Sequence, residues 1–259
     1  MRLTFLGTGT SFGIPQVGCD CAVCRSTDPR DKRTRCSVAV GVGERTILID
    51  TAPELRLQLL ANNIRRVDAV LYTHAHADHV NGIDDLRIFT ARSGGAPLTC
   101  YGPVEALEQI DRGFRYIFDD VKPYAGTSKP QLSLVPVEAG QRLEIAGAKV
   151  LPLAFEHGYV RVFGYRIGSL AYITDAKSIP EAARQQLWGV DVLVLNALWH
   201  RPHPTHLSIE EAVEVARSIG ARQTFFTHLT HETGHAELAA ALPTGIAPAY
   251  DGLSIEVLG

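Results

Sequence analysis

The segment THAHADHVNG, residues 73–82, places four side chains of metal-ligand type within six residues: His74, His76, Asp78 and His79. On an extended backbone, side chains two positions apart point the same way, so His74 and His76 can face one metal ion. Asp78 and His79 follow where the chain turns. Four ligands are too many for a single catalytic ion that keeps an open position. The pattern therefore predicts two adjacent divalent ions, which can share a hydroxide and lower the pKa of water toward about 7.

Several apolar runs of strand length end in a histidine or an aspartate. Besides His74, the residues in this position are Asp50, His157, Asp175 and His228. Open sheets bind ligands at the edge formed by the carboxyl ends of their strands. A single polar residue there would be an ordinary loop start, but five beside a metal motif predict one shared site.

The segment GCDCAVC, residues 18–24, holds three of the five cysteines of the chain: Cys19, Cys21 and Cys24. Disulfides use cysteines in pairs, and a closed tetrahedral zinc site uses four ligands. Either one cysteine is idle, or a fourth ligand comes from elsewhere in the chain. The first residues read as a strand entering a glycine loop and not as a signal peptide, so we expect a cytoplasmic protein. In that reducing compartment, clustered cysteines indicate a metal site.

The elements that must position these residues alternate along the chain. Ten strand-like runs cover residues 2–7, 36–42, 45–50, 68–74, 97–102, 148–157, 162–168, 170–175, 191–196 and 223–228. Helical patterns cover residues 53–63, 103–117, 179–187 and 208–220, and the last begins with a Ser208–Glu211 capping box and stops at Gly220. This mixture predicts an α/β layered protein, and the absence of a linker-like stretch predicts one domain over residues 1–259.

The bulk composition excludes some classes of function. The 259 residues are 46% hydrophobic and 20% charged, with a formal net charge of −3. General nucleic-acid binders are usually basic, so the charge disfavours such a partner. No apolar run approaches the roughly 18 residues that a membrane span requires, so no membrane association is expected.

From the LIDTAP strand end through THAHADH to FFTHLTH, the chain resembles the metallo-β-lactamase-fold hydrolases. The resemblance implies a four-layer αββα sandwich with two catalytic zinc or manganese ions. In that family, one ion would be held by His74, His76 and His157, and the other by Asp78, His79 and His228. Asp175 would bridge both ions. Asp50 would orient a ligand histidine by accepting its other ring N–H.

Two such metal ions can bind the non-bridging oxygens of a phosphodiester, but the leaving alkoxide still needs a proton. Histidine titrates near neutrality and suits that role. The segment WHRPHPTHLS, residues 199–208, offers His200, His203 and His206. We favour His206 as the catalytic histidine because it lies just before the Ser208 helix cap. The roles of His200 and His203 stay open.

GCDCAVC resembles a cysteine motif of the phosphonate-degradation phosphodiesterase branch. That resemblance implies a structural zinc knuckle around residues 18–36, in which Cys19, Cys21 and Cys24 take His231 of THLTH as the fourth ligand. It also implies a small phosphate-ester substrate, with 5-phosphoribosyl 1,2-cyclic phosphate as the best match. Asn196 departs from the branch, which has an acidic residue at this strand end.

Two other functions remain open at this point. A tRNA 3′-processing nuclease shares the dimetal set, but it relies on an inserted RNA-gripping arm that no segment here resembles. Residues 25–35 carry five cations against two aspartates and leave a phosphate contact open. A non-catalytic relative in pyrroloquinoline quinone biosynthesis also carries the cysteine triplet, but its metal motif is degraded. The sequence leaves the oligomeric state undecided, and a homodimer is one possibility.

Overall fold

The computed structural model describes residues 1–121 and 124–258, and within these the chain forms two mixed sheets of seven strands. The first sheet has the order β14 (Ser254–Glu256), β1 (Arg2–Gly7), β2 (Ser37–Val42), β3 (Arg45–Ile49), β4 (Ala69–Leu71), β5 (Leu98–Gly102) and β6 (Leu132–Pro136). The second has the order β13 (Ile246–Pro248), β12 (Gln223–Thr227), β11 (Val192–Asn196), β10 (Leu170–Ile173), β9 (Val160–Ile167), β8 (Ala148–His157) and β7 (Leu143–Ile145).

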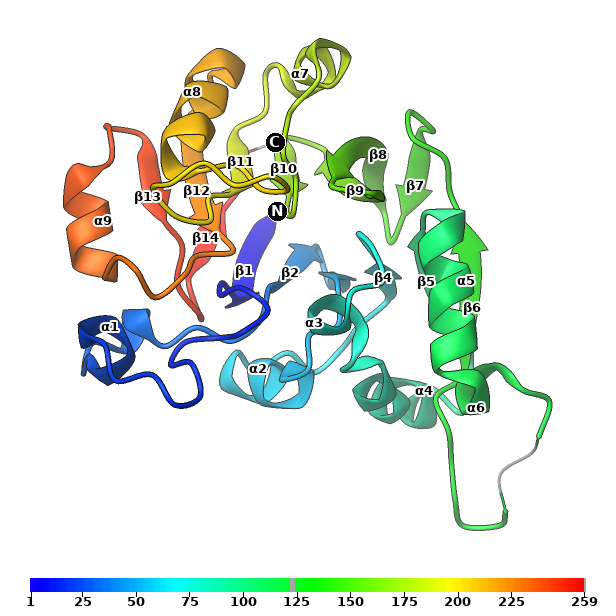
Figure 1. Ribbon diagram of the computed structural model, residues 1–259. Helices are drawn as coiled ribbons and strands as arrows, with labels where there is room; N and C mark the ends of the chain where they lie inside the picture. Colours follow the sequence, from blue (N-terminus) through cyan, green and yellow to red (C-terminus); the bar gives the residue numbers. More distant parts are fainter. Residues whose placement is uncertain (122–123, 259) are drawn as a thin grey trace.

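Helices lie on the outer face of each sheet, as Figure 1 shows. Those near the first sheet are α2 (Leu55–Ala61), α3 (Ala77–Val80), α4 (Arg87–Arg92), α5 (Val104–Gly113) and α6 (Arg115–Phe118). Those near the second are α7 (Glu181–Leu187), α8 (Ile209–Ile219) and α9 (His235–Ala241), while α1 (Ala22–Arg25) belongs to the cysteine segment. Short 3-10 turns span Pro29–Asp31 and Ile83–Leu86. No helix in the described part of the chain is long and apolar enough to cross a membrane.

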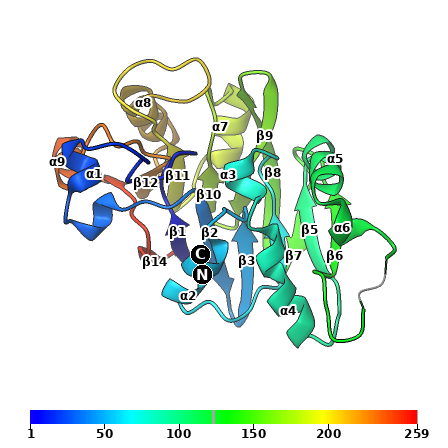
Figure 2. The ribbon, with the colours of Figure 1, turned by 60° about the horizontal axis from the view of Figure 1, so that its bottom comes forward.

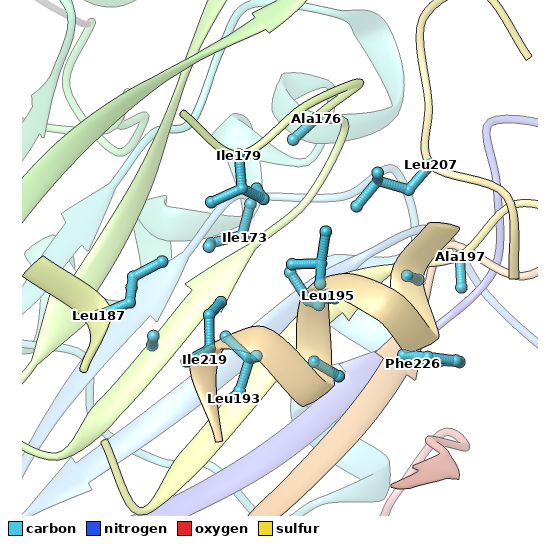
Figure 3. Close-up of a cluster of buried hydrophobic side chains, with 14 of the residues drawn as sticks. Ile173, Ala176, Ile179, Leu187, Leu193, Leu195, Ala197, Leu207, Ile219 and Phe226 are labelled. Atoms are coloured by element: carbon cyan, nitrogen blue, oxygen red, sulfur yellow. The ribbon is translucent and has the colours of Figure 1, made fainter. Parts of the chain in front are cut away.

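Three apolar layers hold these four layers of structure together. The central layer joins the two sheets, with Phe5 and Val40 from the first sheet and Phe163 and Val194 from the second. An outer layer packs α2 and α5 on the first sheet, and another packs α7 and α8 on the second (Figure 3). The four-layer αββα sandwich expected from the sequence is confirmed.

Strand β11 shows how the sequence produces two of these layers. Val192 and Val194 pack between the sheets, and Leu193 and Leu195 pack under the helices. Side chains alternate between the faces of a strand, so a strand covered on both sides reads as a continuous apolar run. The final residue of that run, Asn196, is fully buried.

Four strands, β6, β7, β13 and β14, are not among the ten predicted runs. They are the two edge strands of each sheet. An edge strand has a pairing partner on one side alone, and proteins keep such strands short and less apolar. The sequence pattern is therefore weakest where the sheet ends.

The predicted helix over residues 208–220 is confirmed as α8. The Ser208 side chain accepts the Glu211 N–H, and the Glu211 carboxylate accepts the Ser208 N–H at 2.8 Å. Gly220 ends the helix with a φ of 70°, a left-handed conformation that glycine adopts without steric cost. The capping box fixes where α8 begins, and therefore where the preceding loop must return to the sheet.

Candidate metal centre

The pairing register of the strands brings the carboxyl ends of strands that are distant in the sequence to the same side of the protein. In the second sheet β10, β11 and β12 are parallel, with Ile173 beside Leu195 and Leu195 beside Phe226. Asp175 and His228 follow the ends of β10 and β12. In the first sheet β3 and β4 are parallel, with Ile49 beside Leu71, so Asp50 lies next to the segment that opens the histidine motif. The two sheets thus present their carboxyl ends to the same region.

The side chains predicted for two metal ions converge there. One group comprises His74, His76, His157 and Asp175, a second comprises Asp78, His79 and His228, and a third comprises Asp175, His206 and His228. Within each group the potential ligand atoms lie within 4.8 Å of one another. Asp175 and His228 are each shared between groups, so the groups form one continuous cluster.

Asp175 is the centre of this cluster. Its Oδ2 lies 3.5–3.9 Å from the Nε2 atoms of His74, His79, His157 and His206, and its Oδ1 lies 3.4 Å from that of His228. The carboxylate is 2% exposed. A buried carboxylate facing five imidazoles has the geometry of a group shared between two cations.

Three residues of the site have strained backbones. Asp50, Asp175 and His228 have φ values of 63°, 54° and 59°, in the left-handed region that non-glycine residues rarely adopt. Each costs on the order of 1–3 kcal/mol and persists where surrounding structure enforces it. The sharp turns redirect these side chains from their strands into the common site.

Hydrogen bonds outside the cluster fix the orientation of the histidine rings. His79 Nδ1 lies 2.7 Å from Asp50 Oδ2, and His157 Nδ1 lies 3.0 Å from the carbonyl oxygen of Thr205. Thr73 donates its hydroxyl to Asp50 and can accept the Nδ1–H of His74 at 2.9 Å. Each ring therefore directs Nε2 inward, which is the arrangement that metal-ligating histidines require. The sequence did not indicate Thr73 or Thr205.

Unpaired buried atoms test whether metal ions fit this site. The Nε2 atoms of His79 and His228 are buried with no hydrogen-bond partner among the described residues. Buried polar atoms are nearly always paired, so these atoms need an additional partner. The Nε2 of His74 lies 3.0 Å from Nδ1 of His76, close to the roughly 3.3 Å expected between nitrogens bound tetrahedrally to one zinc. The residues present therefore fit divalent cations.

Burial and neighbouring charges shift the pKa values of the side chains in the same site. Burial opposes ionisation of Asp175, but the facing His228 and His79 outweigh it and hold the pKa of that carboxyl well below its usual range. Burial lowers the pKa of His228 to about 4 and that of His74 well below its usual value. At neutral pH the site thus offers an ionised carboxylate at Asp175 and neutral imidazoles at His74 and His228, the protonation states that metal binding requires.

His79 behaves differently. Burial opposes its protonation, but the surrounding Asp175, Asp50 and Asp78 outweigh this effect and raise the pKa of His79 well above its usual value. These three aspartates therefore favour the protonated form of the His79 ring. A bound cation would replace that proton and the positive charge it supplies.

The loop of residues 197–208, here called the histidine loop, contains three histidines that lie in different surroundings. His206 stacks on His228 with ring centroids 4.8 Å apart and meets His157 edge-on at 4.6 Å. His203 lies behind it, with its Nδ1 3.2 Å from that of His206. His200 points to solvent and pairs with Glu210. His206 is therefore the member of the three that reaches the cluster.

Asn196, noted as a departure in the sequence, supports the loop after Asp175. Its Oδ1 accepts the backbone N–H of Ala176 at 2.9 Å, and both residues are fully buried. A carboxylate at this position could accept the same hydrogen bond. The structure thus gives Asn196 a backbone contact one residue from the central aspartate.

The cysteine segment forms a second cluster. The Sγ atoms of Cys19, Cys21 and Cys24 lie 3.3, 3.3 and 3.4 Å from Nδ1 of His231, and all three cysteines are free. Tetrahedral zinc with sulfur and nitrogen ligands would place these atoms about 3.5 Å apart. Figures 1 and 2 show α1 beside the chain that enters α9, although the two are far apart in the sequence. The idle-cysteine alternative is therefore disfavoured by the geometry.

Two of the thiols differ in acidity. The backbone N–H of Cys24 donates to Cys21 Sγ, and this contact, opposed by burial, lowers the pKa of Cys21 to about 6. Burial raises the pKa of Cys24 to about 11. A thiolate already present at Cys21 gives a cation its first ligand, and the cation can then deprotonate the others.

A buried polar network joins the segment after the cysteines to Thr8 and to the start of α9. The guanidinium of Arg33 donates to Thr8 Oγ1 at 2.8 Å and lies 3.4 Å from His235 Nδ1. Asp31 accepts the backbone N–H of His235 at 2.6 Å. Burial, together with the positive charges of Arg33 and Arg30, lowers the pKa of His235 to about 4, although Asp28 and Asp31 oppose this.

We expect His235 to make the protein less stable in acid. The unfolded chain protonates this histidine near pH 6.5, while the native protein does so near pH 4. Between these values the unfolded state binds more protons, so the free energy of unfolding falls as the pH falls. The loss is on the order of 2–3 kcal/mol across the window.

Urea unfolding at pH 6.5, 5.5 and 4.5 measures this effect, with His235→Gln as the comparison at the same metal concentration. The variant should lose less stability than the wild type over this range. Equal losses in the two proteins would show that His235 is not the group responsible.

The fold and the site together define a metal-dependent hydrolase. Residues 45–229 match the family model described as the beta-lactamase superfamily domain. This chain belongs to the β-lactamase superfamily, and the resemblance to metallo-β-lactamase-fold hydrolases is confirmed. The matched residues run from the start of β3 to Leu229, the residue after His228.

Three known proteins are similar to this chain over almost its whole length. It is 42% identical to a solved structure described as a new diphosphatase from the PhnP family, with a TM-score of 0.91 and coverage of 98% of this chain and 97% of that one. It is 40% identical, over 98% of its length, to an octanoyltransferase of Porphyromonas gingivalis, but it spans only 51% of that relative. Zinc-bound PqqB of Methylobacterium extorquens shares the fold at 22% identity and a TM-score of 0.80, covering 99% of this chain and 100% of that one.

Proposed function

We propose that this protein is a phosphodiesterase that hydrolyses a small phosphate ester at a dinuclear metal centre. The observation that carries the proposal is the buried carboxylate of Asp175, which faces the histidines of both ligand groups and His206. The 42% identity to a PhnP-family diphosphatase supports this branch. The chain spans only half of the octanoyltransferase relative, so that name does not by itself assign an activity to this chain.

Seven residues would hold the two catalytic ions. His74, His76 and His157 would hold one ion, Asp78, His79 and His228 the other, and Asp175 both. Zinc and manganese both suit these nitrogen and oxygen ligands. Bound ions of this kind supply an activated water at neutral pH and stabilise charge on phosphoryl oxygens. Asp50 keeps His79 in the tautomer that faces the ion.

A third ion, structural zinc, would be held by Cys19, Cys21, Cys24 and His231. A site with four protein ligands has no open position and does no chemistry. Its proposed task is to fix the segment that follows β12, because His231 lies three residues after His228. The parallel bridge between Gly9 and Leu229 holds the same segment on its other side.

His206 is the proposed proton donor to the leaving oxygen. Its Nε2 is buried without a hydrogen-bond partner and lies 3.6 Å from Asp175 Oδ2, while its Nδ1 lies 2.9 Å from Thr205 Oγ1. The ring is thus fixed on one side and directed into the site on the other. A positioned acid of this kind contributes when the leaving group is basic.

Replacing His206 with alanine should lower kcat by about 100-fold on an alkyl phosphodiester, the lower end of the range for acid–base catalysis. The loss should be much smaller on bis-p-nitrophenyl phosphate, because p-nitrophenolate leaves without protonation. Steady-state kinetics on both substrates measures the difference. His200→Ala, in the same loop but directed to solvent, is the matched control. Equal losses on the two substrates would contradict the proton-donor role.

The substrate class is tested with purified protein in Mn²⁺ or Zn²⁺. The substrates are bis-p-nitrophenyl phosphate, 5-phosphoribosyl 1,2-cyclic phosphate, a dinucleoside diphosphate and a precursor tRNA. We expect turnover of the diesters, with the cyclic phosphate preferred. A preference for the diphosphate would assign a diphosphatase activity, the activity named for the structural neighbour, and cleavage of the precursor tRNA alone would assign the nuclease. No turnover with either ion would refute the proposal.

A further inference from the structure

We propose that Lys177 is a positioning residue that locks the histidine loop against the loop carrying Asp175. The inference rests on the proposed function, because it concerns how His206 is held at the site. Lys177 lies two residues after Asp175, and its side chain reaches the histidine loop and α8. It was not indicated by any sequence motif.

The contacts of Lys177 join three segments of the chain. Its backbone N–H donates to the carbonyl oxygen of Glu156, the residue before His157. Its ammonium donates to both carboxylate oxygens of Glu211, at 2.7 and 2.9 Å. The same ammonium lies 3.4 Å from the carbonyl oxygen of His206. One side chain therefore contacts both the peptide of His206 and the first turn of the helix that follows.

The carboxylate of Glu211 also forms the capping box of α8, so its contact with Lys177 acts on the start of that helix. It accepts the N–H of Ser208 at 2.8 Å, and Ser208 begins the helix two residues after His206. Burial opposes ionisation of Glu211, but the hydrogen bonds from Lys177 and Ser208 outweigh it and lower the pKa of the carboxyl. The ion pair therefore fixes the end of the histidine loop as well as the start of α8.

Backbone contacts at the same place bring the two loops together without fixing the ring of His206. Leu207 donates its N–H to the carbonyl oxygen of Ala176, and Leu198 donates to that of Leu207. These bonds join the two ends of the histidine loop to each other and to the loop that carries Asp175. Ile209 donates its N–H to the carbonyl oxygen of Trp199, and side-chain contacts act on the outer part of the loop, among them the edge-to-face pair of Trp199 and His203 at 5.2 Å. Lys177 adds a contact that joins the histidine loop to the first turn of α8.

The test uses Lys177→Met, which keeps the length of the side chain and removes its charge, and Lys177→Arg, which restores a cation. The control is Arg184→Met, which removes a cation bonded to Ser218 at the far end of α8. We expect Lys177→Met to lower kcat on an alkyl phosphodiester by about 10- to 100-fold with little change in KM, because a small displacement of a catalytic group has that effect. Lys177→Arg should recover most of the loss, and the control should behave as the wild type.

A fluorescence measurement tests the same inference without activity. The chain has two tryptophans, Trp188, which is exposed, and Trp199 in the histidine loop. In a Trp188→Phe background, Lys177→Met should shift the Trp199 emission to longer wavelength, and Lys177→Arg should not. Unchanged emission and unchanged kcat in Lys177→Met would overturn the inference. If that variant does not fold, Glu211→Gln must show the same shift, and its absence would also overturn the inference.

The two proposals can fail separately. If the wild type turns over no phosphate ester, the proposed function fails, while the emission shift still reports whether Lys177 holds the loop. If the wild type is active and Lys177→Met matches it in kcat and emission, only the positioning role fails.

Discussion

Replacing Asp175 with asparagine should abolish hydrolysis and leave the protein folded. Asparagine has nearly the same shape as aspartate, and it is one of the few residues that tolerate the left-handed backbone found here, φ 54°. The substitution therefore removes the negative charge without new backbone strain. Five imidazoles would then face a neutral amide, which is a weak metal ligand.

The expected loss of kcat/KM exceeds about 100-fold, because removing a residue that merely orients a ligand already costs roughly 10–100-fold. Metal content per chain should fall as well, since both ions would lose a shared ligand. Kinetics, metal analysis and far-ultraviolet circular dichroism on one preparation separate these effects. Asp191→Asn is the control, because Asp191 precedes β11 at the opposite edge of the same sheet and pairs with Arg222.

The same variant distinguishes an enzyme from a metal-dependent binding or scaffold protein. A scaffold needs no carboxylate at this position, so an Asp175→Asn chain would keep its effect in the cell. Retention of that effect, together with retained metal, would contradict the enzymatic proposal. Loss of both turnover and cellular effect is the result we expect.

Replacing Cys21 with serine should damage folding first and activity as a consequence. The proposed zinc ties the segment of residues 19–24 to His231, and structural zinc binds peptides by roughly 10–16 kcal/mol at neutral pH. Loss of one thiolate should lower the free energy of unfolding by on the order of 3–5 kcal/mol, a part of that binding energy. The effect should reach the catalytic site because His228 holds a strained backbone three residues before His231.

Metal analysis and urea unfolding check this result. About three ions per wild-type chain should fall to about two in Cys21→Ser, with a lower unfolding midpoint. Asp20→Ser is the matched control, because Asp20 lies beside Cys21 and its side chain pairs only with the exposed Arg25 among the described residues. A Cys21→Ser protein with normal stability and normal activity would rule out the bracing role.

The strength of the sequence signal varied with its physical origin. The motif at residues 74–79 was visible because its ligands are close in the chain, and Ser208 with Glu211 predicted α8 for the same reason. The edge strands β6, β7, β13 and β14 were not visible, because a strand with one neighbour needs little apolar surface. Thr73, Thr205 and Lys177 were also not visible, because their role comes from contacts with residues near and far that periodicity does not encode.

The sequence by itself determined the kinds of ligand, the alternation of strands that makes four layers, and the family to which the chain belongs. The kinds of ligand and the mixture of strands and helices follow from side-chain chemistry and from local periods of two and 3.6 residues, whereas the four layers and the family follow from the resemblance of the motifs to a known family. Only the tertiary structure decided which residues meet. Parallel register brought Asp175 beside His228, left-handed turns directed both inward, and the fold carried His231 to three cysteines about 210 residues earlier in the chain. Such meetings depend on the packing of whole sheets, and no local stretch of sequence contains them.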